Sequence, residues 1–261
     1  DNDGDLDLFL GSNAWQANDP RCDLFRNGGN GSFTAVAEGP WRGEVLHTFD
    51  PSFVDMNGDG LLDLFILNYD QPACAYLQTW SGSFVKVTAA HVGSIVGNPG
   101  KSYNAAWVDY DNDGDLDLWF EEYRGNTSLH QNDGDGSFTL ATPPSFAQSP
   151  GGHGVWADFD NDGYPELFVG GDTETGVRPN ALYRGTAGED FQNVATTTGV
   201  ALTMATWASA VGDYDNDGWL DIFALHWYEG GANAAKTNVL FHNRRDGTFE
   251  PVDVGSPIRD G

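Results

Sequence analysis

Short apolar runs recur along the chain, each five or six residues long and bounded by Gly, Asn and Asp. Runs this short that are rich in Leu, Phe and Ile are typical of β-strands, because helices are usually much longer. They are apolar on both faces apart from one acidic residue near the start, so we expect each strand to be buried between two sheets. The runs are Leu6–Leu10, Leu62–Leu67, Leu116–Phe120, Pro165–Val169 and Leu220–Leu225.

Three further apolar segments accompany each run. One precedes it, as in Tyr103–Val108, and the other two flank a Gly-rich turn such as Asn132–Gly136. Each repeat therefore holds four short strands in hairpin succession. Four-stranded units that recur about every fifty residues predict an all-β fold, a β-propeller of four-stranded antiparallel blades. We assign five repeats to one domain, at roughly 1–48, 49–102, 103–151, 152–206 and 207–261.

An acidic loop, Asp-x-Asp-x-Asp-Gly-x-x-Asp, precedes each buried run. In repeat three its carboxylates stand at positions one, three, five and nine, and Gly114 at position six permits the bend that brings position nine back. Calcium takes six to eight oxygen ligands in a tolerant geometry, and we expect a main-chain carbonyl at position seven as an additional ligand. Ordinary turns are also rich in Asp, Asn and Gly, but they have no need of a fourth carboxylate at fixed spacing.

The candidate ligands follow this spacing in every repeat, with two departures. Repeat two has an Asn in place of one Asp, and position one of repeat one would precede Asp1. Four to five Ca²⁺ ions are therefore predicted. The candidates are Asp1, Asp3, Asp5 and Asp7; Asp55, Asn57, Asp59, Leu61 and Asp63; Asp109, Asp111, Asp113, Asp115 and Asp117; Asp158, Asp160, Asp162, Tyr164 and Glu166; and Asp213, Asp215, Asp217, Trp219 and Asp221.

The net charge supports bound cations and argues against other partners. The chain has 39 acidic and 12 basic residues and a formal charge of -27. Such a negative charge repels nucleic acid and anionic membrane surfaces. The sequence contains no run of eighteen apolar residues, so we expect no membrane insertion. Divalent ions would relieve the repulsion. Soft metals are poorly served because no Cys or His lies within a loop, and Mg²⁺ would usually keep several waters.

The segments Val211–Phe223 and Asn238–Phe249 resemble the FG-GAP, or VCBS, repeats of integrin α-subunit propellers and of cartilage acidic protein. The resemblance implies a propeller, usually of seven blades, with calcium in the loop between the first two strands of each blade. It also implies an extracellular or cell-surface location and a role in adhesion or recognition. The chain departs from that pattern in its five repeats and in one missing inner strand. We expect an excerpt of a longer array; unseen residues or a neighbouring copy, through self-assembly, could also supply the strand.

No pattern of residues in the sequence indicates a catalytic site. The loop carboxylates are poor acid–base groups because calcium would hold them ionised. The six His occupy non-equivalent positions and are interpreted as structural. We therefore expect a non-enzymatic calcium module with a protein or glycan partner. A lectin-like propeller and part of a secreted polysaccharide-active enzyme stay open as alternatives. The aromatic residues that could stack on sugars are Trp15, Trp41, Trp80 and Trp227.

Two cysteines stand at equivalent positions in adjacent repeats. Cys22 and Cys74 could form a disulfide, but equivalent points on neighbouring blades can lie beyond the Cα spacing that a disulfide requires. Both interpretations are left open. Asn30 and Asn126 begin glycosylation sequons, which matter only in a secreted protein of a glycosylating host.

Overall fold

The computed structural model describes most of the chain, and nearly all of its regular structure is strand. The described chain divides into two compact units, which are treated separately below: Asp1–Trp107, Asp115–Phe120 and Leu129–Ala141 form the first, and Val108–Gly114, Glu121–Ser128 and Thr142–Gly261 the second. The described residues are 3–12, 21–44, 46–96, 102–122, 126–171, 178–185, 190–226 and 238–253.

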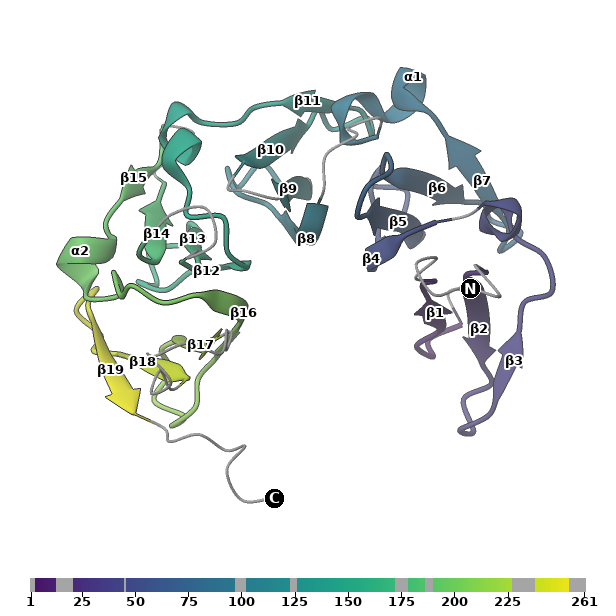
Figure 1. Ribbon diagram of the computed structural model, residues 1–261. Helices are drawn as coiled ribbons and strands as arrows, with labels where there is room; N and C mark the ends of the chain where they lie inside the picture. Colours follow the sequence, from purple (N-terminus) through teal and green to yellow (C-terminus); the bar gives the residue numbers. More distant parts are fainter. Residues whose placement is uncertain are drawn as a thin grey trace. The chain divides into compact units, whose positions relative to one another are not determined.

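The strands form antiparallel sheets in which spatial order follows chain order (Figure 1). The first two sheets lie in the first unit. The first has β1 (Leu8–Leu10), β2 (Asp23–Asn27) and β3 (Phe33–Ala35), and the second has β4 (Thr48–Val54), β5 (Asp63–Asn68), β6 (Cys74–Gln78) and β7 (Phe84–Val87). Short helical turns follow them: η2 (Pro40–Gly43), α1 (Ala89–Val92) and η3 (Gly93–Ile95).

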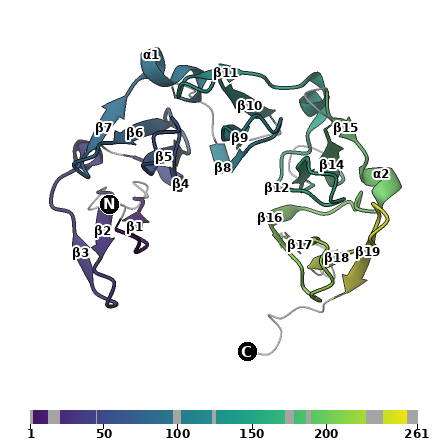
Figure 2. The same ribbon diagram turned by 180° about the vertical axis from the view of Figure 1, so that it is seen from behind.

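The other three sheets have four strands each, and the view from behind shows the same succession (Figure 2). The third has β8 (Ser102–Val108), β9 (Asp117–Glu122), β10 (Asn126–Asn132) and β11 (Phe138–Leu140), followed by η4 (Pro144–Gln148). The fourth has β12 (Gly154–Ala157), β13 (Glu166–Val169), β14 (Ala181–Arg184) and β15 (Gln192–Asn193), followed by α2 (Ala195–Thr198). The fifth has β16 (Thr206–Gly212), β17 (Asp221–His226), β18 (Val239–Asn243) and β19 (Phe249–Asp253).

The predicted succession of four strands is confirmed in the second to fifth sheets, whereas the first sheet has three strands among the described residues, and an all-β architecture is confirmed. Each apolar run forms one strand, and in the second to fifth sheets that strand is the second. Every residue of β5 and of β13 is buried. In β1 only the central residue is buried, so the prediction of burial on both faces is wrong there. The acidic residue at position nine is the first residue of the second strand in these four sheets, at the start of β5, β9, β13 and β17.

One core of the first unit is built around Trp41, which is only 1% exposed. Its ring packs edge-on against those of Phe9 (5.6 Å), Tyr76 (5.8 Å) and Phe84 (5.5 Å). These rings come from the first and second sheets, so the two sheets share one aromatic core. The suggestion that Trp41 stacks on a sugar is therefore wrong.

A second core of the same unit joins β5 to β9 and β11. Phe65 and Leu67 pack with Phe120 and Phe138, and Trp107 packs edge-on against Phe65 at 5.4 Å. The second unit repeats the arrangement, since apolar side chains of β13 and β14 pack with those of β17 and β18. Large apolar side chains thus fill the space between consecutive sheets within each unit.

Cys22 and Cys74 are both free and buried. The Cys22 sulfur accepts the Ser12 N–H at 3.4 Å, and both thiols belong to the core around Trp41. Asn30 is exposed on the turn before β3, while the side chain of Asn126 lies outside the described residues. Within the described part of the chain, no helix has the length and apolarity needed to cross a membrane.

Candidate metal centres

The acidic loops connect the first and second strands of the second to fifth sheets, where the sequence places them. Positions four and six adopt left-handed backbone conformations. In repeat five these are Asn216 (φ 59°) and Gly218 (φ 89°). Asn tolerates this region because its short side chain bonds locally, and Gly has no Cβ to clash. Repeats three and four use the same pair of residue types, and repeat two has Gly at both positions.

The carboxylate at position one closes each loop. In repeat five, the two oxygens of Asp213 accept the N–H groups of Asp217 (2.9 Å) and Gly218 (2.8 Å). Asp55, Asp109 and Asp158 accept the corresponding pair in their own repeats, at 2.9 to 3.1 Å. The side chain of position one is therefore held in place before any ion binds, with lone pairs left for a ligand bond.

The acidic residue at position nine is buried and joins the loop to the third strand. The carboxylate of Asp221 accepts the N–H of Tyr214 (3.1 Å) at one oxygen and that of Asn243 (2.7 Å) at the other. Asp63 makes the same pair of bonds with the N–H groups of Met56 and Gln78. These bonds orient the group toward the loop.

Burial makes two of the position-nine acids, Asp63 and Glu166, costly to ionise. Loss of hydration, together with the nearby charges of Asp59 and Asp55, raises the pKa of Asp63 to about 6, although the hydrogen bonds from Gln78 and Met56 act in the opposite direction. Loss of hydration likewise raises the pKa of Glu166 to about 8. One oxygen of Glu166 accepts the N–H of Phe159 at 2.8 Å, whereas the buried Oε1 has no hydrogen-bond partner among the described residues. A cation beside Glu166 would satisfy that oxygen and favour the ionised form.

The carboxylates of three loops converge. In each group, one ligand atom per residue lies within 4.8 Å of the others. Ligands that share a calcium ion at about 2.4 Å are no farther apart than about 4.8 Å, so these residues fit a hard cation. The groups are Asp109, Asp111 and Asp117; Asp158, Asp160 and Glu166; and Asp213, Asp215 and Asp217.

The other candidate ligands are placed less completely. In repeat two, Asn57 Oδ1 accepts the Asp59 N–H at 3.1 Å, and the acidic residues form no such group among the described residues. In repeat one, Asp1 lies outside the described residues, while Asp3 accepts the N–H of Asp5 (3.0 Å). At position five, Asp162 accepts the N–H of Tyr164, as Asp59 does that of Leu61. Carbonyl ligation at position seven, by Asp5, Leu61, Asp115, Tyr164 and Trp219, and the role of Asp7 and Asp113 stay predictions.

Basic side chains from the third strands reach the loops, a feature that the sequence reasoning missed. The Arg184 guanidinium lies 2.8 Å from Asp160. Arg245, from the turn after β18, pairs with Asp217 at 2.7 Å. His242 Nδ1 lies 3.3 Å from Asp221. Interpreting every His as structural overlooked this approach, because His242 stands 21 residues beyond Asp221.

Two buried asparagines, Asn132 and Asn243, connect the loops of consecutive repeats; we call them the bridging asparagines. The Asn132 amide donates to the carbonyls of Met56 (3.1 Å) in repeat two and Leu116 (3.2 Å) in repeat three. Asn243 donates in the same way to the carbonyls of Phe159 (2.8 Å) in repeat four and Leu220 (3.0 Å) in repeat five. Each bridging asparagine thus holds position two of one loop and position eight of the next.

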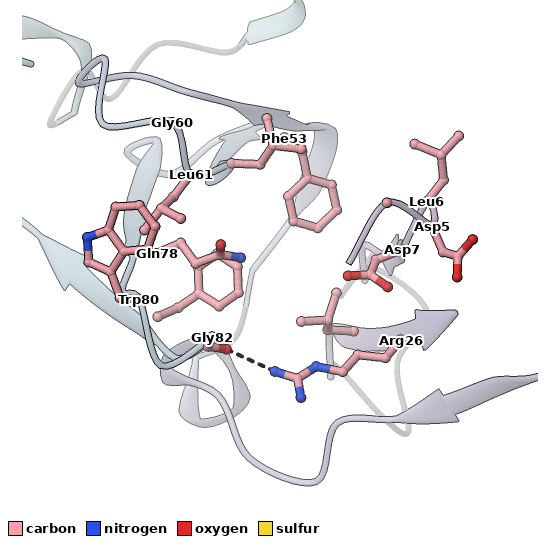
Figure 3. Close-up of a pocket in the computed structure, with 14 residues that line it drawn as sticks. Asp5, Leu6, Asp7, Arg26, Phe53, Gly60, Leu61, Gln78, Trp80 and Gly82 are labelled. Atoms are coloured by element: carbon pink, nitrogen blue, oxygen red, sulfur yellow. Dashed lines mark hydrogen bonds between the residues drawn. The ribbon is translucent and has the colours of Figure 1, made fainter. Parts of the chain in front are cut away.

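A cavity of about 630 Å³ opens between the loops of repeats one and two (Figure 3). Phe53 and Leu61 line it, and Arg26 donates to the Gly82 carbonyl at 3.0 Å on its border. Trp80 also borders the cavity and is 84% exposed. Trp15 and Trp227, the other aromatic residues considered for sugar stacking, lie outside the described residues.

Comparison with known proteins finds one repeat family along most of the chain. The FG-GAP-like repeat family matches residues 1–66, 55–120, 118–169 and 158–224. Cartilage acidic protein 1 of Xenopus tropicalis is 27% identical over 191 residues, which cover 66% of this chain and 29% of that protein. The human protein is 28% identical over 192 residues, covering 66% of this chain and 28% of that protein. The chain thus spans less than a third of the curated relatives it matches.

Among solved structures, AofleA from Arthrobotrys oligospora aligns with a TM-score of 0.49 and 10% sequence identity. The alignment covers 96% of this chain and 69% of that chain. At this level of similarity we draw no conclusion from it about fold or ligand.

Proposed function

This chain belongs to the FG-GAP-like repeat family, and from that premise we propose that it is a calcium-binding β-propeller module in which each ion rigidifies one repeat. The convergence of the loop carboxylates, together with the buried and unpartnered Oε1 of Glu166, carries the proposal. When bound, the ion supplies positive charge that offsets the repulsion within each loop. The groups that would hold it are the converging carboxylates of repeats three, four and five, and more weakly Asp55, Asn57, Asp59 and Asp63 of repeat two.

The sheets support a propeller. Each is antiparallel, its strands follow chain order, and consecutive sheets within a unit share an apolar core. Face-to-face stacking of four-stranded sheets is the arrangement of propeller blades. We propose that these sheets are blades of a propeller.

We further propose that the module acts outside the cell in adhesion, recognition or assembly, without an enzymatic activity, and that its partner is a protein or a glycan. The formal charge of -27 supports an environment in which divalent cations are abundant. Extracellular calcium modules bind with dissociation constants of about 10⁻⁴ to 10⁻³ M, which suits sites that contain an amide or a competing basic side chain.

Removal of calcium tests the proposal. An ion that binds only the folded protein stabilises it by about 2.7 kcal/mol per site when its concentration is a hundred times the dissociation constant. EDTA should therefore lower the melting temperature strongly, and calcium should restore it. Asp213→Asn should weaken binding at one site, whereas Asp246→Asn, in the exposed turn after β18, should not. A melting curve that EDTA leaves unchanged would refute calcium binding.

Carbohydrate binding is a second candidate function, favoured by the exposed Trp80 beside the cavity of repeats one and two. An exposed aromatic ring offers a flat apolar face next to polar groups, here Arg26 and Gln78. A glycan array would test it. Glycan binding that Trp80→Ala abolishes would support a sugar site. If the array shows no bound glycan, carbohydrate binding is refuted and only the proposal of adhesion, recognition or assembly remains.

A further inference from the structure

Repeat five brings a nitrogen donor to its acidic loop. His242 Nδ1 lies 3.3 Å from Asp221 Oδ1 and 3.7 Å from Asp215 Oδ2. His242, Asp215 and Asp221 together form a group whose ligand atoms lie within 4.8 Å of one another. This group differs in chemistry from the all-carboxylate groups of the other loops.

We propose that His242, Asp215 and Asp221 form a site for a borderline transition metal ion such as Zn²⁺. Imidazole suits zinc and other transition ions, whereas calcium and magnesium prefer oxygen. The site shares two carboxylates with the calcium loop of repeat five, so the two ions compete there. It does not depend on calcium binding in any other repeat.

The distances fit zinc. Tetrahedral ligands at about 2.0 to 2.1 Å from a Zn²⁺ ion lie about 3.3 to 3.4 Å from one another. The two separations from His242, 3.3 Å and 3.7 Å, differ from this value by no more than a few tenths of an ångström, and the ligand atoms of Asp215 and Asp221 lie within 4.8 Å of each other. The side chains of His242 and Asp215 are 26% and 34% exposed, so water can reach the remaining coordination position.

The surroundings hold two of the ligands in place. Asp221 is 1% exposed, and its carboxylate is oriented by the N–H groups of Tyr214 and Asn243. The His242 ring packs edge-on against the Tyr214 ring, with centroids 5.6 Å apart. Such outer contacts fix the direction of metal ligands.

The same loop is weakened as a calcium site. Arg245 bonds to Asp217 through Nε (2.8 Å) and a terminal nitrogen (2.7 Å), which occupies the carboxylate of position five. Calcium gains from each charged oxygen, so this pairing disfavours it. A three-ligand site completed by water is a common arrangement for zinc.

Among the described residues equivalent to His242 in the other repeats, none offers this donor. Two observations identify the residues equivalent to His242: the register of the second and third strands, and the backbone N–H of the next residue, which donates to the acidic residue at position nine. Arg and Leu supply no neutral nitrogen ligand, and the Gln amide nitrogen has no free lone pair. The equivalent residues are Arg26, Leu77, Gln131 and Arg184.

Calorimetric titration of the chelator-treated chain with Zn²⁺ alone tests the site. The wild-type chain should bind one Zn²⁺ ion tightly. His242→Gln should weaken this binding by at least about tenfold, because Gln offers no imidazole nitrogen. His47→Gln is the matched control: it removes a His–Asp pair elsewhere, with Asp70, and should leave the affinity unchanged. Substituted Co²⁺ should give a visible absorption band that His242→Gln abolishes.

Three results would overturn the site: no Zn²⁺ binding by the wild-type chain, equal binding by His242→Gln, or an equal loss in His47→Gln, which would indicate adventitious surface binding. Melting of the metal-free variants checks that they fold. Calcium titration of the same samples separates the two ideas. Zn²⁺ binding that needs His242 while calcium binds nowhere would refute the proposed function and leave this site standing.

Discussion

Replacement of Asn132 by Ala should destabilise the first unit and loosen the loop of repeat two, although Asn132 belongs to repeat three. The side chain donates to the carbonyls of Met56 and Leu116, and its oxygen accepts the Gly134 N–H at 3.1 Å. Ala removes all three hydrogen bonds. The Met56 N–H is held by Asp63, so Asn132 fixes the other side of the same loop residue.

The magnitude follows from burial. A buried polar group left without a partner costs about 1 to 3 kcal/mol. Met56 is 0% exposed, so water has little access to its carbonyl, whereas Leu116 and Gly134 are exposed and can be rehydrated. Asn132 itself is 4% exposed, and Ala leaves a small gap. We expect a loss of about 2 to 4 kcal/mol, most of it from the Met56 carbonyl.

Urea unfolding of the calcium-free chain measures this loss, and Asn30→Ala provides the matched control. Asn30 accepts the Ser32 N–H at 3.0 Å in an exposed turn, so its replacement should cost less than about 1 kcal/mol. Equal losses in the two variants would refute the reasoning, because burial would then have no influence. Calcium titration should also show weaker binding at repeat two in Asn132→Ala.

Two other predictions concern a buried base and a close approach. Burial lowers the pKa of His130 to about 4, and its Nδ1 bonds to Ser94 Oγ at 2.7 Å. In the unfolded chain the His130 imidazole takes up a proton near pH 6.5, whereas in the folded chain it does so only near pH 4. The free energy of unfolding is therefore unaffected by this group above pH 6.5, and it falls by about 3 kcal/mol as the pH is lowered to 4. Urea unfolding at pH 7, 5 and 4 should show a shallower loss for His130→Gln; parallel losses would contradict this. A Cβ on Gly93 (φ +61°) would lie 2.2 Å from the Phe138 carbonyl oxygen, so Gly93→Ala should cost at least about 2 kcal/mol. Gly212→Ala meets open space and should leave the melting temperature unchanged, and equal melting temperatures for the two Gly variants would contradict the argument.

The loops and strands could be predicted from the sequence because the interactions that form them are local. Position one bonds to positions five and six of the same loop, so a fixed spacing encodes the geometry. The strand succession follows from the same periodicity. The role of Trp41 could not be predicted in this way, because burial of a single aromatic residue leaves no periodic pattern.

Contacts between distant strands were missed for a different reason. Asn132 lies 76 residues from Met56, and His242 lies 21 residues from Asp221. Whether such side chains meet depends on strand register and on packing between sheets, which spacing alone does not specify. One signal was present: Asn27, Asn132 and Asn243 each stand directly before the turn that leads into the last strand of their repeat. Because these residues were interpreted as parts of turns, their hydrogen bonds to loop carbonyls were not predicted.

The bridging asparagines also give the repeats a direction. The loop of repeat two is completed by repeat three, and the loop of repeat four by repeat five. Since a chain is synthesised from its N-terminus, these two loops reach their final form only after the following repeat has emerged and paired its strands. Each of these two loops is therefore completed only after one further repeat has been synthesised.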